Sequence, residues 1–294
     1  MKRETSLGSR IFDVVNVLLL LLLGIITLYP FWYVMMYSIS EPMRAGAANF
    51  LLWPIGFQLD NYKTLFSQAN IGHAAFISVS RTVLGTLGSV FCCSLFGYLL
   101  TKNLLPFRKL MYRMLVITMY LSPGLIPWYI TMRMFGLKNN FLLYILPGLI
   151  SAFNVILIKT YIESISPALE ESALIDGAGY FTIYRKIIFP LCVPVLATVS
   201  IFTAVGQWNE WTDNMFLANI PELETLQYLL YRYLSSAEAN LASMKNQLKK
   251  VNFVVTPTSI KMTITMIVTL PIIIVYPMLQ RYFVKGIMLG AVKG

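Results

Sequence analysis

The chain has 294 residues, of which 57% are hydrophobic and only 12% are charged, and this charged share is about half of that in a soluble domain. A soluble fold of this length could not hide so much apolar surface from water, so the composition excludes an ordinary soluble domain and predicts a membrane protein. The formal net charge of +10 does not indicate a nucleic-acid partner, because the basic residues lie mostly between apolar runs, where they orient a chain in the membrane.

The chain begins with a basic segment, residues 1–10, and a long apolar run follows at residues 14–39. A signal peptide would have a shorter apolar stretch, followed by small residues at a cleavage site. Here the run continues through the aromatic stretch from Tyr29 to Tyr33, so we predict a retained first membrane span. Residues 40–73 are mixed and polar and predict a loop that carries a short helix near residues 59–66.

Five further apolar runs follow, and each has the roughly 20 residues that a helix needs to cross the hydrocarbon core. Because the runs are continuous and do not alternate, they predict helices and not strands. The second run carries small residues four apart, Gly85 with Ser89 and Gly88 with Cys92, which permit close helix packing in lipid. Proline and glycine interrupt the third run. The five runs are residues 74–100, 112–132, 141–161, 190–211 and 260–283.

These runs predict an all-α fold, a polytopic membrane protein with six transmembrane helices. If the N-terminus lies in the cytoplasm, six spans return the C-terminus there, and the cytoplasmic segments hold 13 of the 23 lysines and arginines, a modest excess in the expected direction. We divide the chain into residues 1–73, with the first span and an extracytoplasmic loop, a core at 74–284, and a cytoplasmic tail at 285–294. The core includes a cytoplasmic loop at 162–190 and an extracytoplasmic loop at 212–258.

Residues that carry chemistry are scarce in this sequence. All three cysteines fall inside apolar runs, where small packing residues are expected, and His73 is the one histidine. We therefore expect no catalytic residues and no metal site. The sequence also lacks a glycine-rich loop of the Gly-x4-Gly-Lys-Ser/Thr type, so the chain is not expected to bind ATP itself.

The loop at residues 162–190 is the most informative segment. Ser166 is a favourable N-cap residue and Pro167 suits the first helical position, while Gly177 predicts the end of a short helix. Ala173 and Gly177 are four residues apart, so they share one helix face and leave it with almost no side chain. The adjacent stripe is polar: Ser172 and Asp176. Two interpretations are open from these residues, a helix that docks on another protein and a helix that lies on the bilayer surface.

The same loop resembles the signature loop of importer permeases of the ATP-binding-cassette (ABC) class. That signature is Glu-Ala-Ala, three residues, Gly, nine residues, then Ile-x-Leu-Pro. The spacing here matches throughout: Glu171, Ser172, Ala173, Gly177, and then Ile187 to Pro190. Serine in place of the first alanine and Phe189 in place of leucine are mild departures.

Two other features resemble carbohydrate importers in particular. The triplet Asp176-Gly177-Ala178 is similar to the sugar-importing MalG family. The stretch Leu28-Tyr29-Pro30 and the last ten residues, 285–294, resemble a subgroup of that family typified by LplC and YtcP, which is associated with complex oligosaccharides. The resemblance covers most of the chain, and the loop is its most specific part.

The resemblance implies a type I ABC importer permease fold in a bacterial plasma membrane, with both chain ends in the cytoplasm. It implies an assembly of this chain with a second, homologous permease, two cytoplasmic ABC ATPases and an extracytoplasmic solute-binding protein, surrounded by lipid. The permease would form half of the translocation pathway for an oligosaccharide and do no covalent chemistry. ATP and Mg would be used by the partner ATPases, and this chain would bind no cofactor.

The family motif also implies which residues contact the ATPase. Glu171 would be the charged contact, with Ser172 beside it, and Ala173 and Gly177 would be the close-packed face. Asp176 would be a second polar contact or a local cap. Solvated helix charges are the alternative interpretation of Glu171 and Asp176.

Candidates for the substrate path come from aromatic and amide residues in or near broken spans, where irregular backbone usually lines a cavity. Sugars present C–H faces that pack on aromatic rings and hydroxyls that need polar partners. The candidates are Tyr120, Trp128, Tyr129, Trp208 and Asn209. Anchoring at the membrane interface or core packing is the alternative for the aromatic residues. We expect the nearby carboxylates Glu210 and Asp213 to stay solvated at the outer end of the fifth span.

Three other functions compete with this one. The first is an ABC permease for a non-sugar nutrient such as a peptide or phosphate. The second is an ion-coupled secondary transporter, but such proteins usually carry paired intramembrane acids or inverted repeats, and we find neither. The third is an intramembrane enzyme, which the single histidine disfavours.

Overall fold

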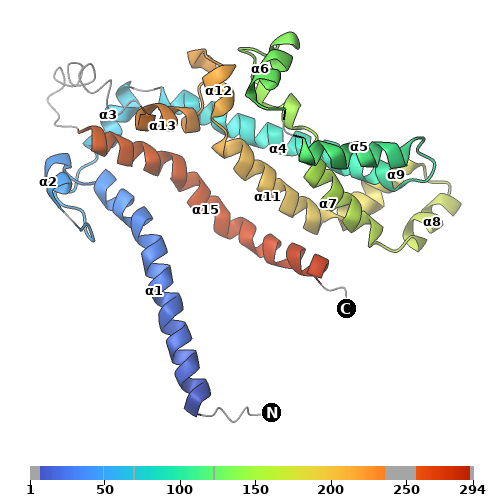
Figure 1. Ribbon diagram of the computed structural model, residues 1–294, viewed down its shortest axis with the longest axis horizontal. Helices are drawn as coiled ribbons and strands as arrows, with labels where there is room; N and C mark the ends of the chain where they lie inside the picture. The colour runs from blue at the N-terminus through green and yellow to red at the C-terminus, as the bar shows by residue number, and fades with distance from the viewer. Residues whose placement is uncertain (1–6, 49, 69, 122, 236–255, 292–294) are drawn as a thin grey trace. The chain divides into compact units, whose positions relative to one another are not determined.

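The computed structural model describes residues 7–48, 50–68, 70–121, 123–235 and 256–291, and throughout these ranges the regular structure is helical (Figure 1). The predicted all-α fold is thereby confirmed. The chain divides into two compact units, Met1–Ala69 with Arg232–Thr269 and Asn70–Tyr231 with Leu270–Gly294, which are described one at a time. The segments predicted above, 1–73, 74–284 and 285–294, stay predictions, and parts of the expected loop at 212–258 and of both chain ends lie outside the described residues.

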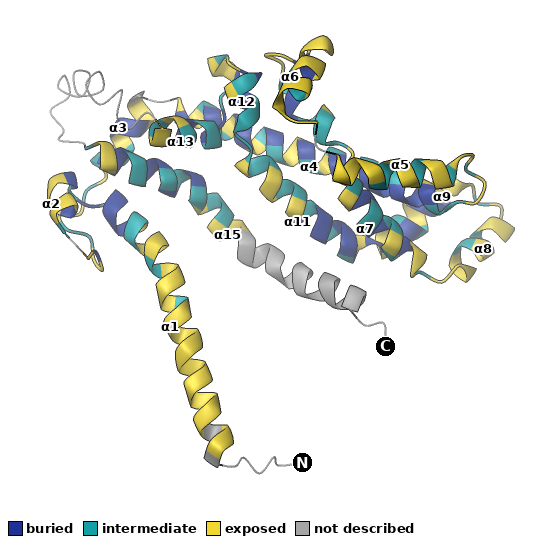
Figure 2. Ribbon diagram, viewed as in Figure 1, coloured by how far each residue is buried: buried dark blue, intermediate teal, exposed yellow. Residues whose placement is uncertain are grey.

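The first unit contains α1 (Leu7–Ser38), α2 (Pro42–Ala47), α3 (Asp60–Gln68) and the start of α15 (Pro257–Ala291), which continues into the other unit. Most of α1 is exposed, and its exposed side chains are large and apolar (Figure 2), as expected for a helix that faces lipid. Near the end of α1, Met36 and Tyr37 are buried together with Leu51. The short helix predicted near residues 59–66 is confirmed as α3, whose Asn61 donates a hydrogen bond to the Ser38 carbonyl over 3.1 Å.

The second unit is built around α4 (Ile71–Thr101), α7 (Ala152–Glu163) and α11 (Val193–Asn209). Their shared core includes Cys93, Val155 and Val199, each fully buried. Small residues on α4 allow the close packing that the sequence predicts. A Cβ atom on Gly85 would lie 2.9 Å from the Gln207 side chain of α11, and one on Gly88 would lie 2.6 Å from Leu149.

Shorter helices complete the second unit. They are α5 (Arg108–Tyr120), α6 (Leu125–Met134), the 3-10 helices η1 (Phe141–Tyr144), η2 (Leu146–Gly148) and η4 (Pro221–Leu223), α8 (Ala168–Ile175), α9 (Tyr180–Ile183), the π-helix η3 (Tyr184–Ile188), α10 (Phe189–Leu191) and α12 (Thr212–Phe216). Helix α13 (Leu226–Ser235) begins here and ends in the first unit.

The predicted count of six spans is not reproduced exactly. Three helical segments of the described chain are long and apolar enough to cross a membrane: Ile11–Ser38, Ile71–Thr101 and Pro257–Val275. Two bent pairs raise the number to five if each counts as one span: Phe141–Gly148 with Ala152–Glu163, bent by 44°, and Tyr180–Leu191 with Val193–Phe216, bent by 79°.

The span predicted at residues 112–132 is instead two short helices, α5 and α6. The break falls at Pro123, which has no backbone N–H to donate, and at Gly124, whose φ of +76° is a left-handed conformation. These two residues therefore end one helix and begin another.

Candidate functional site

The motif loop folds as a short helix with a defined beginning. Pro167 has helical backbone angles (φ −60°, ψ −26°), and its carbonyl accepts the N–H groups of Glu170 and Glu171, both over 3.0 Å. Both carboxylates lie in the first turn, where they complement the positive end of the helix dipole. The structure has Pro167 itself as the N-cap of a helix that begins at Ala168, so the N-cap predicted at Ser166 and the first helical position predicted at Pro167 are each one residue too early.

The end of α8 is a Schellman motif, in which a left-handed residue closes the helix. Asp176 is the C-cap, and Gly177 follows with a φ of +80°. The Gly177 N–H donates to the Leu174 carbonyl over 3.0 Å, and the Ala178 N–H donates to the Ala173 carbonyl over 2.9 Å. A Cβ on Gly177 would meet no atom within 4 Å, so the structure requires glycine here for its backbone angle and not for space.

The side chains of α8 divide into an attached side and an exposed side. Ala173 is half-buried and, with Ala178 beyond the helix end, packs against the core that α4, α7 and α11 share. The motif residues Glu171, Ser172 and Asp176 are exposed. The exposed side also carries an apolar residue, because 86% of the Ile175 side chain is exposed.

A carboxylate next to the motif ties α8 to the end of α4. Glu170 forms an ion pair with Lys102 and accepts a hydrogen bond from the Tyr98 hydroxyl over 3.3 Å. The Lys102 ammonium also lies 4.1 Å from the centroid of the Tyr98 ring. Both charged side chains are mostly buried, with 14% of Lys102 and 19% of Glu170 exposed. The sequence alone does not predict this contact, because Glu170 lies 68 residues from Lys102 and 72 residues from Tyr98.

A cavity of about 510 Å³ lies elsewhere in the second unit, between α4, α6, the η1–η2 turn, α7 and α11. Aromatic side chains form part of its wall: Trp128, Tyr144, Phe153 and Phe202. Polar side chains form another part: Arg81, Ser89, Ser151, Asn154, Thr203, Gln207, Glu210 and Asp213. This combination of apolar faces with a few polar groups is typical of small-molecule sites.

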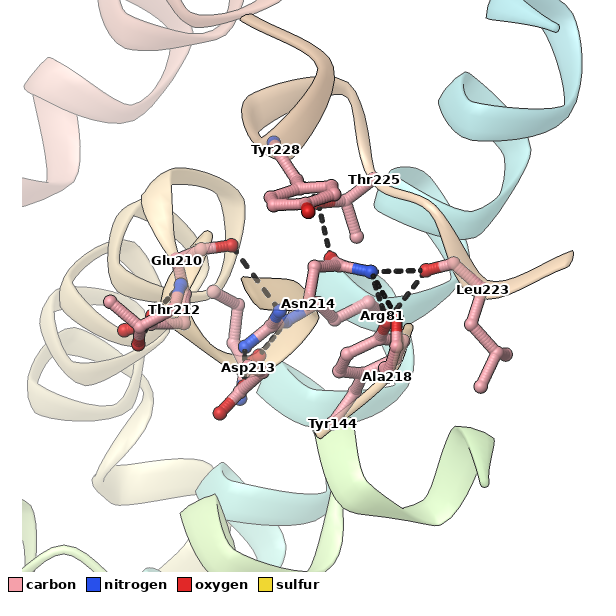
Figure 3. A network of polar contacts seen from close by, with 11 residues as sticks. Arg81, Tyr144, Glu210, Thr212, Asp213, Asn214, Ala218, Leu223, Thr225 and Tyr228 are labelled. Atoms are coloured by element: carbon pink, nitrogen blue, oxygen red, sulfur yellow. Dashed lines mark hydrogen bonds and ion pairs between the residues drawn. The ribbon is translucent and has the colours of Figure 1, made fainter. Parts of the chain in front are cut away.

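Arg81 of α4 lies at the centre of the polar wall (Figure 3). Its Nη2 is 2.6 Å from Asp213 Oδ2 in an ion pair, and its side chain is only 3% exposed. Its Nε donates to Gln207 Oε1 over 2.9 Å, and its Nη1 donates to the Glu210 carbonyl over 3.3 Å. The guanidinium also lies 4.5 Å from the centroid of the Tyr144 ring. Arg81 thus joins α4 to the end of α11 and to α12.

A second set of hydrogen bonds holds the chain beyond α11 in place. The fully buried Asn214 donates from Nδ2 to the Tyr144 hydroxyl over 2.9 Å and to the Leu223 carbonyl over 2.8 Å. The Thr225 hydroxyl donates to Asn214 Oδ1 over 2.8 Å, and the Tyr144 hydroxyl donates to the Leu223 carbonyl over 2.6 Å (Figure 3). Asp213 therefore faces Arg81 from a segment that is fixed on its other side.

The structure brings one of the five predicted substrate-path residues to this cavity, Trp128. Tyr129 packs with Trp128 against a neighbouring apolar cluster around Met132, and Tyr120 is 85% exposed at the end of α5. Trp208 and Asn209 lie in the last turn of α11 and do not line the cavity.

The expectation that Asp213 stays solvated is wrong, because its side chain is 12% exposed and paired with Arg81. Arg81 was not among the predicted site residues. A signal was present, since an arginine inside an apolar run is rare in a membrane span and usually has a function and a partner. The partner itself was hidden, because Asp213 lies 132 residues further along the chain.

Comparisons with known proteins find a family match and relatives that cover nearly all of the chain. Residues 94–289 match the family model described as binding-protein-dependent transport system inner membrane component. The chain is 34% identical to the polygalacturonan/rhamnogalacturonan transport system permease protein YtcP of Bacillus subtilis (strain 168), covering 97% of this chain and 99% of that protein. It is 35% identical to the protein LplC of the same strain, covering 98% of this chain and 96% of that protein.

One solved structure is also similar to this chain over nearly its full length. The crystal structure of a bacterial ABC transporter involved in the import of the acidic polysaccharide alginate contains a chain that superposes with a TM-score of 0.87. That chain is 30% identical in sequence, and the superposition covers 95% of this chain and 98% of that chain. The family match at residues 94–289 includes the motif loop.

Proposed function

This chain belongs to the binding-protein-dependent inner membrane components, the permeases of sugar and oligosaccharide ABC importers, and we propose that it forms one half of the translocation pathway of an oligosaccharide importer. The observation that carries the proposal is the cavity of about 510 Å³, whose wall combines four aromatic side chains with hydroxyl, amide and carboxylate groups. Such a wall offers ring faces to the C–H faces of sugars and hydrogen-bond partners to their hydroxyls.

In this proposal α8 is the element through which a cytoplasmic ATPase moves the permease. Three motif residues, Glu171, Ser172 and Asp176, are exposed and available to a partner, and Ile175 adds an apolar contact beside them. Ala173 packs inward, and Gly177 sets the direction in which the chain leaves the helix. Closure of the ATPases would pull on α8, and the membrane helices would change between two arrangements, as in other domain-closure transitions.

The assembly that we propose contains a second, homologous permease chain, two cytoplasmic ABC ATPases and an extracytoplasmic binding protein that delivers the sugar. ATP and Mg²⁺ are bound by the ATPases, and this chain contributes no cofactor. Both ends of the chain lie in the cytoplasm. The names of the relatives, which mention polygalacturonan, rhamnogalacturonan and alginate, support a glycan as the cargo.

ATP-dependent uptake by the reconstituted assembly tests the function. Proteoliposomes that contain both permeases and the ATPases are expected to take up labelled oligosaccharide only when ATP and the binding protein are supplied. Uptake that follows an ion gradient without ATP would refute the proposal and favour a secondary transporter.

Site-specific cross-linking tests the docking surface. We expect Ile175→Cys to cross-link to an ATPase subunit, because that side chain is exposed beside the motif carboxylates. Phe135→Cys, at a position that is 73% exposed just after α6, is the matched control and should give no such product. The native Cys93 and Cys192 are buried and contribute little background. The same yield from both variants would contradict the assignment of α8 as the docking helix.

A further inference from the structure

The charges on the cavity wall determine which sugars this subunit can bind. Arg81 is the one cationic side chain among the described residues of the wall, and the carboxylates are Glu210 and Asp213. Asp213 neutralises Arg81 through the 2.6 Å ion pair, while Glu210 makes no ion pair within the described residues. The wall therefore offers no unpaired cation and one unpaired carboxylate.

Each of the two carboxylates on the wall keeps one oxygen that no donor of the described chain contacts. Glu210 Oε1 accepts from the Thr212 backbone N–H over 2.8 Å and from the Thr212 hydroxyl, and Asp213 Oδ2 is held by Arg81. Within the part of the chain that the structure describes, the second oxygen of each carboxylate accepts no side-chain or backbone hydrogen bond. A carboxylate oxygen is an acceptor only, so these two oxygens suit hydroxyl donors and repel another carboxylate.

We propose that the wall contributed by this subunit binds uncharged sugar units through their hydroxyls and ring faces, and that the Asp213–Arg81 pair prevents it from binding a uronate carboxylate. This inference rests on the proposed function. Arg81 is a positioning residue in this arrangement, because its ion pair and hydrogen bonds join α4 to the end of α11 and to α12. A carboxylate on the sugar would have to bind elsewhere in the pathway.

Matched sugars make the inference testable. Carboxyl reduction converts a trimer of galacturonate or mannuronate into the neutral trimer with the same linkages, so each pair differs only in its carboxylates. Initial uptake of both members of each pair is measured in proteoliposomes that contain the full assembly. Because the same binding protein serves wild type and variants, the change in the acidic-to-neutral ratio reports on the cavity alone.

Asp213→Asn is the decisive variant, because asparagine keeps an acceptor oxygen for Arg81 but removes the neutralising charge. It should raise the acidic-to-neutral ratio by about tenfold, since the freed guanidinium then faces the sugar in a partly desolvated site. Glu210→Gln removes the same charge without freeing a cation, so it is the control and should raise the ratio by only about two- to threefold. Equal changes in both variants would overturn the role of the pair.

The double variant Arg81→Gln/Asp213→Asn removes both charges of the pair and tests whether Arg81 itself binds the sugar. Because it leaves no unpaired buried charge, it can still be measured if Asp213→Asn alone fails to fold. It keeps the net charge of the wall, so the acidic-to-neutral ratio should stay at the wild-type value. A selective loss of acidic uptake would show that Arg81 binds uronate and would overturn the inference while leaving the proposed function intact. Failure of every acidic and neutral trimer to be taken up would overturn the proposed function and the inference with it.

Discussion

Removal of the Glu170 charge should uncouple ATP hydrolysis from sugar uptake while the protein still assembles. Helix α8 has only eight residues, and a helix of this length is not stable in water without contacts to the rest of the protein. In the described chain, its charged attachment to α4 is the Glu170–Lys102 pair, supported by the Tyr98 hydroxyl. Glu170→Gln keeps the shape of the side chain but leaves the Lys102 ammonium without its counterion.

The size of the effect follows from burial. With 14% and 19% of the two side chains exposed, this pair is more buried than a surface ion pair, and it carries a charge-assisted hydrogen bond. Hydrogen bonds to charged groups contribute about 1.5–3 kcal/mol, and a loss of about 2 kcal/mol corresponds to a roughly thirtyfold increase in the population of detached α8. The core packing of the membrane helices is not touched, so insertion and basal ATP hydrolysis should persist.

The assay compares sugar uptake with phosphate release in the same proteoliposomes, and the ratio of the two should fall severalfold in Glu170→Gln. The control is Glu163→Gln, because Glu163 also pairs with a lysine, Lys159, over 2.6 Å, but within α7 itself. An unchanged ratio in Glu170→Gln, or an equal fall in Glu163→Gln, would refute the argument that this contact transmits motion.

Two further predictions concern glycines whose neighbourhoods differ. Gly177→Ala should weaken the end of α8 by about 1–2 kcal/mol, because alanine disfavours a φ of +80°, and uptake per ATP should fall. Gly179→Ala, at an extended position with no atom within 4 Å of the added Cβ, should leave uptake unchanged, so a similar loss in both would count against the explanation. Gly85→Ala should displace the Gln207 side chain, which lies 2.9 Å from the new Cβ, and lower stability by about 0.5–1.5 kcal/mol through the lost bond to Arg81. Thermal unfolding of the purified assembly measures this change, and Gly72→Ala, in open space, should show none.

The sequence was sufficient for those parts of the fold that depend on local composition. Long apolar runs predicted the spans at α1, α4 and the start of α15. The proline at 167 and the glycine at 177 predicted the beginning and the end of the short helix α8. The single span predicted at residues 112–132 was wrong, because Pro123 and Gly124 were interpreted as an interruption within one span, whereas they separate the two helices α5 and α6.

The polar contacts could not be predicted from a single sequence, because they join residues that are far apart in the chain. Glu210 and Asp213 lie in a segment that reads as a solvated loop, and only the fold turns Asp213 toward Arg81. The choice of aromatic residues near broken spans found Trp128 but not Phe153 or Phe202, since proximity to a break does not determine the direction of a side chain.

The π-helix at Tyr184–Ile188 sets how α8 and α9 are rotated relative to the helical segment that leads into α11. The Phe189 N–H bonds to the Tyr184 carbonyl, five residues back and not four, so the segment contains one residue more than an α-helix would need. One residue corresponds to about 100° of rotation in an α-helix. Insertion or deletion of a single residue at this point would therefore turn α8 and α9 around the axis of the Tyr180–Leu191 segment without altering α11. In the proposed assembly, such a change would re-aim the exposed side of α8 relative to the ATPase that it is proposed to contact.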